Sequence, residues 1–299
     1  MKNSHGILMD LELSILSEEV KIISVDFFDT LFLRDCIIPT DIFKRIEAEY
    51  GIKDFSKSRI LAEKIARSKK IKEDINLQEI YQNFQCSQKN KKKYIEIEIK
   101  EELKALRPNQ NLVHILKKAS ESNKSLILLS DSYLDINFFK TVLKKHDLDF
   151  FDHIFISSDY RLTKATGNLF KATEKFGYFS SKKELNKEIL HIGDNIVADN
   201  KMPKKLGISV FFLPSMNEVL RSKCKFLFHK NHYNDFEKKF LSFYCERNYE
   251  SLFSNTDVPE LNHFVETKIT PLLFFHFNYL KNLFDSNNSK SICLAYRDG

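Results

Sequence analysis

The chain has 299 residues, and its hydrophobic share of 42% and charged share of 29% are typical of a folded protein of about two domains. The net charge is +6, but acidic residues are interspersed with the lysines and no nucleic-acid-binding motif occurs, so we expect no nucleic-acid partner. Five scattered cysteines argue against a disulfide framework, and no signal peptide is apparent, so the expected compartment is the cytoplasm.

The first buried strand is predicted over Ile22–Val25, after a helix over Asp10–Glu19. A short apolar run bounded by polar residues is typical of a strand covered on both faces, as in a parallel sheet. Asp26 follows this strand at its carboxyl end, which is the edge where open α/β sheets bind ligands. Taken alone, Asp26 is also explained as an ordinary loop aspartate.

A region rich in lysine and glutamate follows, with isoleucine and leucine at helical spacing. We assign residues 34–106 to a helical cap inserted into an α/β core of residues 1–33 and 107–214. Lysines between Lys89 and Lys93 fit either a solvated helix end or a ligand-binding patch. The cap helices are predicted over Asp41–Tyr50, Ser56–Lys72, Leu77–Phe84 and Tyr94–Leu106.

Strands alternate with helices in the next part of the chain, a pattern that predicts a doubly wound parallel sheet. The remaining strands are predicted over Ser125–Leu129, His153–Ser157, Glu188–Ile192 and Ile208–Leu213, and helices over Asn111–Ser122 and Ile136–Lys145.

The pattern changes after Pro214, and we expect residues 215–299 to form a helical extension. Helices are predicted over residues 217–225, 233–247 and 260–285, and the last ten residues resemble the opening strand of a second α/β domain. The longest apolar stretch, Ile269–Phe284, is interrupted by polar residues and is too short for a transmembrane span.

Polar residues follow three of the later strands. Ser130 and Asp131 follow one, Lys164 lies in the loop after the next, and Asp194 and Asp199 follow the fourth strand of the sheet. Several of these residues also have an explanation without a functional role. Asp131 and Ser132 could cap the helix that begins at Ile136, and Lys164 could be an exposed loop lysine. His191, within the fourth strand, is expected to be a satisfied core histidine, and Gly193 to permit a close approach of the backbone.

The order carboxylate, hydroxyl, lysine and acidic pair resembles the four-motif signature of the haloacid dehalogenase-like (HAD) superfamily, over about Lys21 to Pro214. The resemblance implies that Asp26 is a nucleophile that forms an aspartyl-phosphate. It implies that Ser130, Asp131 and Lys164 bind the substrate phosphate. It further implies that Mg²⁺ is held by Asp26, the backbone carbonyl of Phe28 and Asp194, with Asp199 holding a metal-bound water or supporting the other ligands.

The chain departs from this family at one position. The general acid/base aspartate of HAD phosphatases lies two residues after the nucleophile, and that position is Phe28 here. Three explanations remain open: a leaving group that needs no protonation, another proton donor such as Asp29, or a weakened enzyme.

The resemblance implies a magnesium-dependent hydrolase of a small phosphorylated metabolite such as a sugar phosphate. The FDT, SDxYL and HIGDN segments also resemble a bacterial HAD group linked to surface-polysaccharide biosynthesis, which implies a glycosyltransferase or second-domain partner. The alternative function is a phosphate-binding scaffold protein with weak turnover. A third option is dehalogenation, although Lys164, Asp194 and Asp199 together suit a metal and a phosphate.

Overall fold

The computed structural model describes residues 6–36, 38–215 and 269–286, together with positions 218, 237, 240 and 241. Apart from those four positions, the helices expected over residues 217–225 and 233–247 lie outside the described residues, as does the strand expected at the carboxyl end. The helix expected over 260–285 is seen in part as α15, Thr270–Ser286. In the described ranges, no helix has the length and apolar character needed to cross a membrane.

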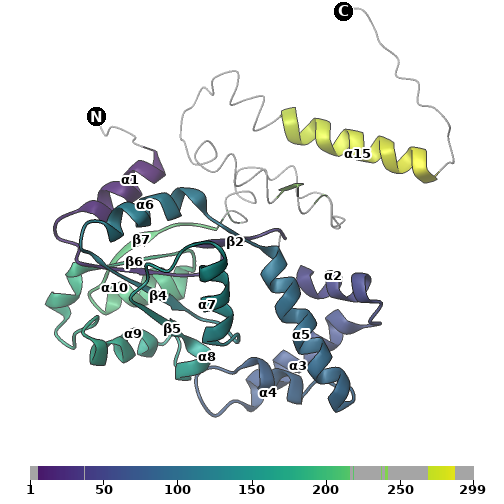
Figure 1. Ribbon diagram of the computed structural model, residues 1–299, viewed down its shortest axis with the longest axis horizontal. Helices are drawn as coiled ribbons and strands as arrows, with labels where there is room; N and C mark the ends of the chain where they lie inside the picture. Colours follow the sequence, from purple (N-terminus) through teal and green to yellow (C-terminus); the bar gives the residue numbers. More distant parts are fainter. Residues whose placement is uncertain are drawn as a thin grey trace, which may run out of the picture.

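The centre of the fold is a parallel sheet of five strands in the order β5-β4-β1-β6-β7 (Figure 1). This confirms the predicted doubly wound sheet, and each strand end lies within one residue of its predicted position. The strands are β1 (Ile22–Val25), β4 (Ser125–Ser130), β5 (His153–Ile156), β6 (Ile189–Gly193) and β7 (Ser209–Phe212).

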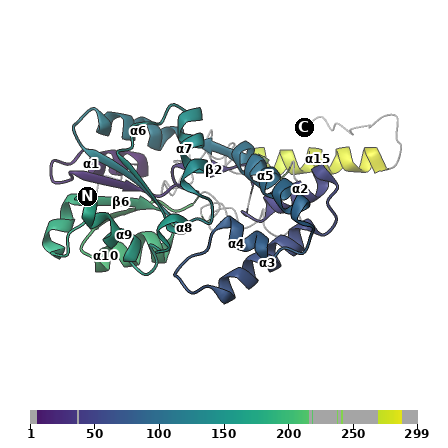
Figure 2. The ribbon, with the colours of Figure 1, turned by 60° about the horizontal axis from the view of Figure 1, so that its bottom comes forward.

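Helices cover both faces of the sheet, as Figures 1 and 2 show together. Side chains alternate across a strand, so a sheet covered on both faces needs apolar residues at successive positions. In β4, Leu126 and Leu128 belong to one hydrophobic cluster, whereas Ile127 and Leu129 belong to a second cluster on the opposite face. The first cluster includes residues of α1 (Ile7–Leu16), α6 (Gln110–Ser120) and α7 (Ile136–Lys145), and the second includes residues of α9 (Asn168–Ala172).

Short helical segments complete the core. They are α8 (Ser157–Tyr160), the 3₁₀ segments Thr173–Phe176 and Lys183–Glu188, the π-helical turn Ile196–Lys201 and α10 (Met202–Lys205). The π-helical turn begins three residues after the last residue of β6 and carries Asp199, so its wide turn sets the position of one predicted site residue.

A helical insert stands beside the sheet (Figure 2). Its two connections to the core pair as a small antiparallel sheet of β2 (Phe32–Arg34) and β3 (Leu106–Pro108). Three-residue strands carry too little periodicity to be predicted, and we did not expect this sheet. The insert contains α2 (Asp41–Tyr50), α3 (Phe55–Lys69), α4 (Leu77–Gln82) and α5 (Gln88–Ala105).

The interior of the insert holds a buried ion pair. Arg59 on α3 donates to both oxygens of Glu98 on α5, at 2.7 and 2.8 Å, and the Tyr81 hydroxyl donates to the same carboxylate at 2.7 Å. Neither Arg59 nor Glu98 is exposed, so the pair fixes the register of α3 against α5. The lysines at 89–93 lie on the largely exposed first turns of α5, as expected for a solvated helix end.

Candidate active site

The site lies at the carboxyl end of β1, where the order of the strands reverses. The chain proceeds from β1 to β4 and β5 on one side and then to β6 and β7 on the other. Such a switch point opens a crevice outside the carboxyl ends of the strands. Asp26 follows β1, and Asp194 follows the adjacent β6. The topology therefore brings together two carboxylates that are 168 residues apart in sequence.

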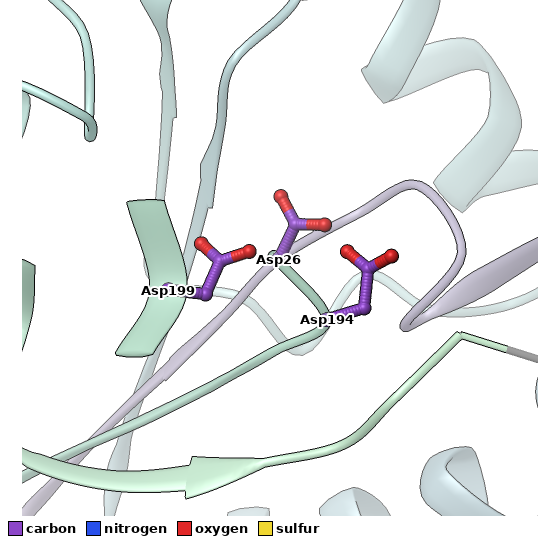
Figure 3. A group of neighbouring side chains, drawn as sticks. All are labelled: Asp26, Asp194 and Asp199. Atoms are coloured by element: carbon purple, nitrogen blue, oxygen red, sulfur yellow. The ribbon is translucent and has the colours of Figure 1, made fainter. Parts of the chain in front are cut away.

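Three carboxylates converge there. One oxygen from each of Asp26, Asp194 and Asp199 lies within 4.8 Å of the others. Figure 3 shows that the three carboxylate groups are directed to the same side of the loops that carry them. Burial, opposed in part by Lys164, raises the pKa of Asp26 to about 7. Burial together with the charge of Asp26 raises the pKa of Asp194 to about 8. Carboxylate oxygens concentrated in this way suit a hard divalent cation such as Mg²⁺.

Lys164 is buried among these carboxylates. Its Nζ lies 2.5 Å from Asp26 Oδ1 and 2.6 Å from Asp199 Oδ1, and only 2% of its side chain is exposed. Burial acts to lower the pKa of Lys164, but the charges of Asp199 and Asp26 outweigh burial and raise this pKa well above its usual value. Lys164 is therefore a fixed cation at the site, and the alternative of an exposed loop lysine is wrong.

Asp199 is held by three donors. Besides Lys164, the backbone N–H of Asn195 donates to Oδ2 at 3.0 Å, and His191 Nε2 lies 2.9 Å from Oδ1. Burial acts to raise the pKa of Asp199, but Lys164 and His191 outweigh it and hold this pKa below the usual aspartate value. Asp199 is therefore an ionised partner of Lys164.

His191 is fully buried and has a partner on each ring nitrogen. Its Nδ1 lies 2.9 Å from Ser24 Oγ on the neighbouring strand, and burial lowers its pKa. A neutral imidazole that donates from Nε2 to Asp199 and accepts from the Ser24 hydroxyl satisfies both contacts. The prediction of a satisfied core histidine is confirmed.

The position of the Asp199 side chain leaves no room for a side chain at Gly193. A Cβ atom at Gly193 would lie 2.5 Å from Asp199 Cγ, which is closer than real carbon atoms approach. The expected close approach therefore involves the Asp199 side chain.

Two buried hydroxyls that are close in sequence to the site residues have no hydrogen-bond partner within the described part of the chain. They belong to Ser130, at the end of β4, and to Thr30, in the loop after Asp26. An unpaired buried hydroxyl is unfavourable by about 1–3 kcal/mol, and a bound acceptor would remove this cost. A phosphoryl oxygen is a strong acceptor for the Ser130 hydroxyl. Together with the carboxylate cluster, these hydroxyls fit a site for Mg²⁺ and phosphate.

Asp131 and Ser132 do not cap the helix at Ile136, as one interpretation of the sequence predicted. Asp135 caps α7 instead, with Oδ1 accepting the Phe138 N–H at 3.1 Å. Both oxygens of Asp131 accept the backbone N–H of Lys164, at 2.9 and 3.1 Å. Asp131 therefore ties the Lys164 loop to the loop after β4, a role that no local sequence signal could give.

Phe28 lies two residues after Asp26, at the position where the resemblance of the sequence led us to look for an acid/base carboxylate. Its ring packs against Phe139, and the Arg34 guanidinium lies 3.9 Å from the ring centroid. Asp29 adopts a left-handed backbone conformation (φ 57°), and Oδ2 pairs with Arg34 Nη1 at 3.2 Å. Arg34 was not singled out in the sequence, because its proximity to Phe28 depends on the unpredicted β2.

A cavity of about 510 Å³ lies between the core and the insert. Phe28, Arg34, Asp131 and Tyr133 line it, together with residues on either side of Lys164 and with residues of the insert. The cavity has the volume of a small-metabolite pocket.

No family model and no curated protein matches the chain. Similar solved structures include an HAD phosphatase from Thermococcus onnurineus, with a TM-score of 0.47 and 18% identity over 65% of this chain and 86% of that chain. They also include a haloacid dehalogenase-like family hydrolase from Xanthomonas campestris, with a TM-score of 0.44 and 15% identity over 66% of this chain and 82% of that chain. A third is an L-2-haloacid dehalogenase from Xanthobacter autotrophicus with chloropropionic acid covalently bound. Its TM-score is 0.47, and it is 13% identical over 69% of this chain and 83% of that chain. At these TM-scores and identities, the likenesses assign neither a family nor an activity.

Proposed function

We propose that the protein is a magnesium-dependent hydrolase of the HAD type that acts on a small phosphorylated metabolite through an aspartyl-phosphate on Asp26. The observation that carries this proposal is the buried contact between Asp26 and Lys164 inside a cluster of three carboxylates. A nucleophilic carboxylate can approach a phosphoryl group only where cations offset the negative charge of both partners.

Asp26, Asp194 and the Phe28 carbonyl would hold Mg²⁺, and Asp199 would hold a metal-bound water. The bound ion would supply charge compensation for the carboxylates and the phosphoryl oxygens. Asp26 forms a bond to phosphorus while the bond from phosphorus to the leaving-group oxygen breaks. Lys164 offsets charge on the transferring group, and the Ser130 hydroxyl donates to one of its oxygens. Water then attacks phosphorus and releases phosphate and the free Asp26 carboxylate.

Phe28 cannot protonate the leaving group. Asp29 is engaged by Arg34, so we assign it no part in proton transfer. The proposal therefore favours substrates whose leaving group departs as a stable anion, such as the carboxylate of an acyl phosphate. A sugar phosphate, with a poorer leaving group, would be hydrolysed more slowly.

The alternative function is a phosphate-binding protein that keeps the site and turns over weakly, and Phe28 is the observation that favours it. A role beside a glycosyltransferase in surface-polysaccharide biosynthesis rests on the resemblance of the sequence motifs alone.

One experiment separates the two functions. Beryllium fluoride, which mimics phosphate on a carboxylate, is added with Mg²⁺, and a panel of acyl phosphates and phosphate esters is then assayed for phosphate release. Binding and turnover that are both lost in Asp26→Asn support the hydrolase. Binding without turnover over the whole panel supports the phosphate-binding protein, and metal-dependent turnover that survives Asp26→Asn excludes the proposed mechanism.

A further inference from the structure

Glu73, in the insert between α3 and α4, accepts hydrogen bonds from the loop that carries Lys164. Its Oε2 accepts the backbone N–H of Thr163 at 2.9 Å and the Thr166 hydroxyl at 2.6 Å, and its Oε1 accepts Asn168 Nδ2 at 2.5 Å. These donors lie on both sides of Lys164 in the sequence. Although partial burial acts to raise the pKa of Glu73, the same hydrogen bonds outweigh it and lower this pKa, so the group is a carboxylate.

The next residue, Asp74, reaches the loop that follows Ser130. The Ser157 hydroxyl donates to Asp74 Oδ2 at 2.5 Å and accepts the backbone N–H of Ser132 at 2.8 Å. Asp74 is 5% exposed, and Arg67 of α3 pairs with its other oxygen at 3.0 Å. One serine therefore links the insert to the loop of the candidate phosphate-binding residue Ser130.

We propose that Glu73 and Asp74 are positioning residues through which the insert sets the geometry of both phosphate-binding loops. The inference rests on the proposed function and deepens it. Asp131 joins the two loops through the Lys164 N–H, so Glu73, Asp74 and Asp131 form one connected set of acceptors. Displacement of the insert would remove the acceptors for Thr163, Thr166 and Asn168 at once, and the backbone on both sides of Lys164 would lose this support.

Both residues line the cavity between core and insert. A substrate that fills this cavity contacts the insert and the loops together, so its binding favours the arrangement in which these hydrogen bonds are made. The insert then contributes to the rate by ordering Lys164 and Ser130, in addition to any direct contact with the substrate.

The test compares Glu73→Ala and Glu73→Gln with the control Glu79→Gln. Glu79 also joins the insert to the core, through Arg161 Nη1 at 2.5 Å, but it makes no described contact with residues 163–168. Its amide replacement can still accept from Asn76 at the start of α4. Glu73→Ala is expected to lower kcat for a small aryl or acyl phosphate about tenfold or more, with KM changed less than about threefold. Glu73→Gln keeps one acceptor oxygen and is expected to recover most of this loss, and Glu79→Gln to stay within about twofold of the wild type.

Hydrogen exchange with Mg²⁺ and beryllium fluoride gives a second measure that needs no turnover. Glu73→Ala is expected to accelerate exchange of the amides over residues 163–168, and the control to leave them unchanged. A wild-type protein without turnover would refute the proposed function, while the exchange comparison would still test the positioning role. Unchanged exchange over 163–168 in Glu73→Ala, or equal kcat in Glu73→Ala and Glu79→Gln in an active wild-type background, would overturn the inference.

Discussion

Lys164 Nζ contacts Asp26 Oδ1 at 2.5 Å, so the candidate nucleophile is paired with a buried cation that comes from 138 residues further along the chain. The pairing has consequences for stability as well as for activity, because both groups are buried.

Replacement of Lys164 by methionine removes the only positive charge that contacts both Asp26 and Asp199 among the described residues. We expect Lys164→Met to destabilise the metal-free protein by about 3 kcal/mol, since it leaves two buried carboxylates without a cation. Urea unfolding in the presence of a chelator measures this change. The added substitution Asp26→Asn should restore part of the lost stability, and a strictly additive further loss would contradict the pairing.

Asp26→Asn should reduce phosphate release by about a thousandfold or more, because an amide is not a nucleophile. The fold should persist, since the asparagine is close in size and the site loses a charge that burial disfavours. Steady-state assays with Mg²⁺, combined with circular dichroism, check both parts. A variant that unfolds would leave the loss of activity uninformative, so the denaturation midpoint of Asp26→Asn is measured alongside it.

The raised pKa values of Asp26 and Asp194 make the stability of the metal-free protein depend on pH. In the folded state these pKa values are about 7 and about 8, against an ordinary value of 3.8, so between about pH 4 and 8 the folded state binds more protons than the unfolded state. The contribution of these two groups to stability is therefore present at low pH and is lost as the pH rises towards 8.

Asp194→Asn isolates this effect. With chelator the variant should be more stable than the wild type by about 1 kcal/mol or more at pH 8.5, and this advantage should be smaller at pH 5. Thermal melts at the two pH values measure the difference. Greater stability of the wild type at pH 8.5 would contradict the assignment.

Gly193→Ala should damage the site through sterics alone. The added methyl group would lie 2.5 Å from Asp199 Cγ, so Asp199 must move away from Lys164 and His191. We expect a loss of about 1–3 kcal/mol in unfolding free energy together with a lower apparent Mg²⁺ affinity. Calorimetric titration with Mg²⁺ and urea unfolding test the two effects.

The sheet was predictable from sequence because each strand is a run of apolar residues that ends in a polar one. The ends of α2 and α7 were also predicted to the residue, from the spacing of Ile42, Phe43 and Ile46 in α2 and of Phe138, Phe139 and Val142 in α7. Because parallel strands place their carboxyl ends at one edge, the meeting of Asp26 with Asp194 followed from the predicted topology.

Other parts of the site depend on contacts between distant segments and left no local signal. Asp131 accepts from Lys164, and Glu73 from Thr163, across 33 and 90 residues of sequence. Likewise, the π-helical turn that carries Asp199 cannot be told from an α-helix by residue type. These features are tertiary, and only the folded chain defines them.

The central claim is that Asp26 carries the phosphoryl group. The most direct measurement is to quench the enzyme in acid during turnover of an acyl phosphate with Mg²⁺, reduce it with borohydride, and locate the modified residue by peptide mass spectrometry. Reduction converts an aspartyl-phosphate to homoserine, and the account predicts homoserine at position 26 and unmodified aspartate at 194 and 199. Homoserine at another aspartate, or turnover that continues in Asp26→Asn, would contradict it.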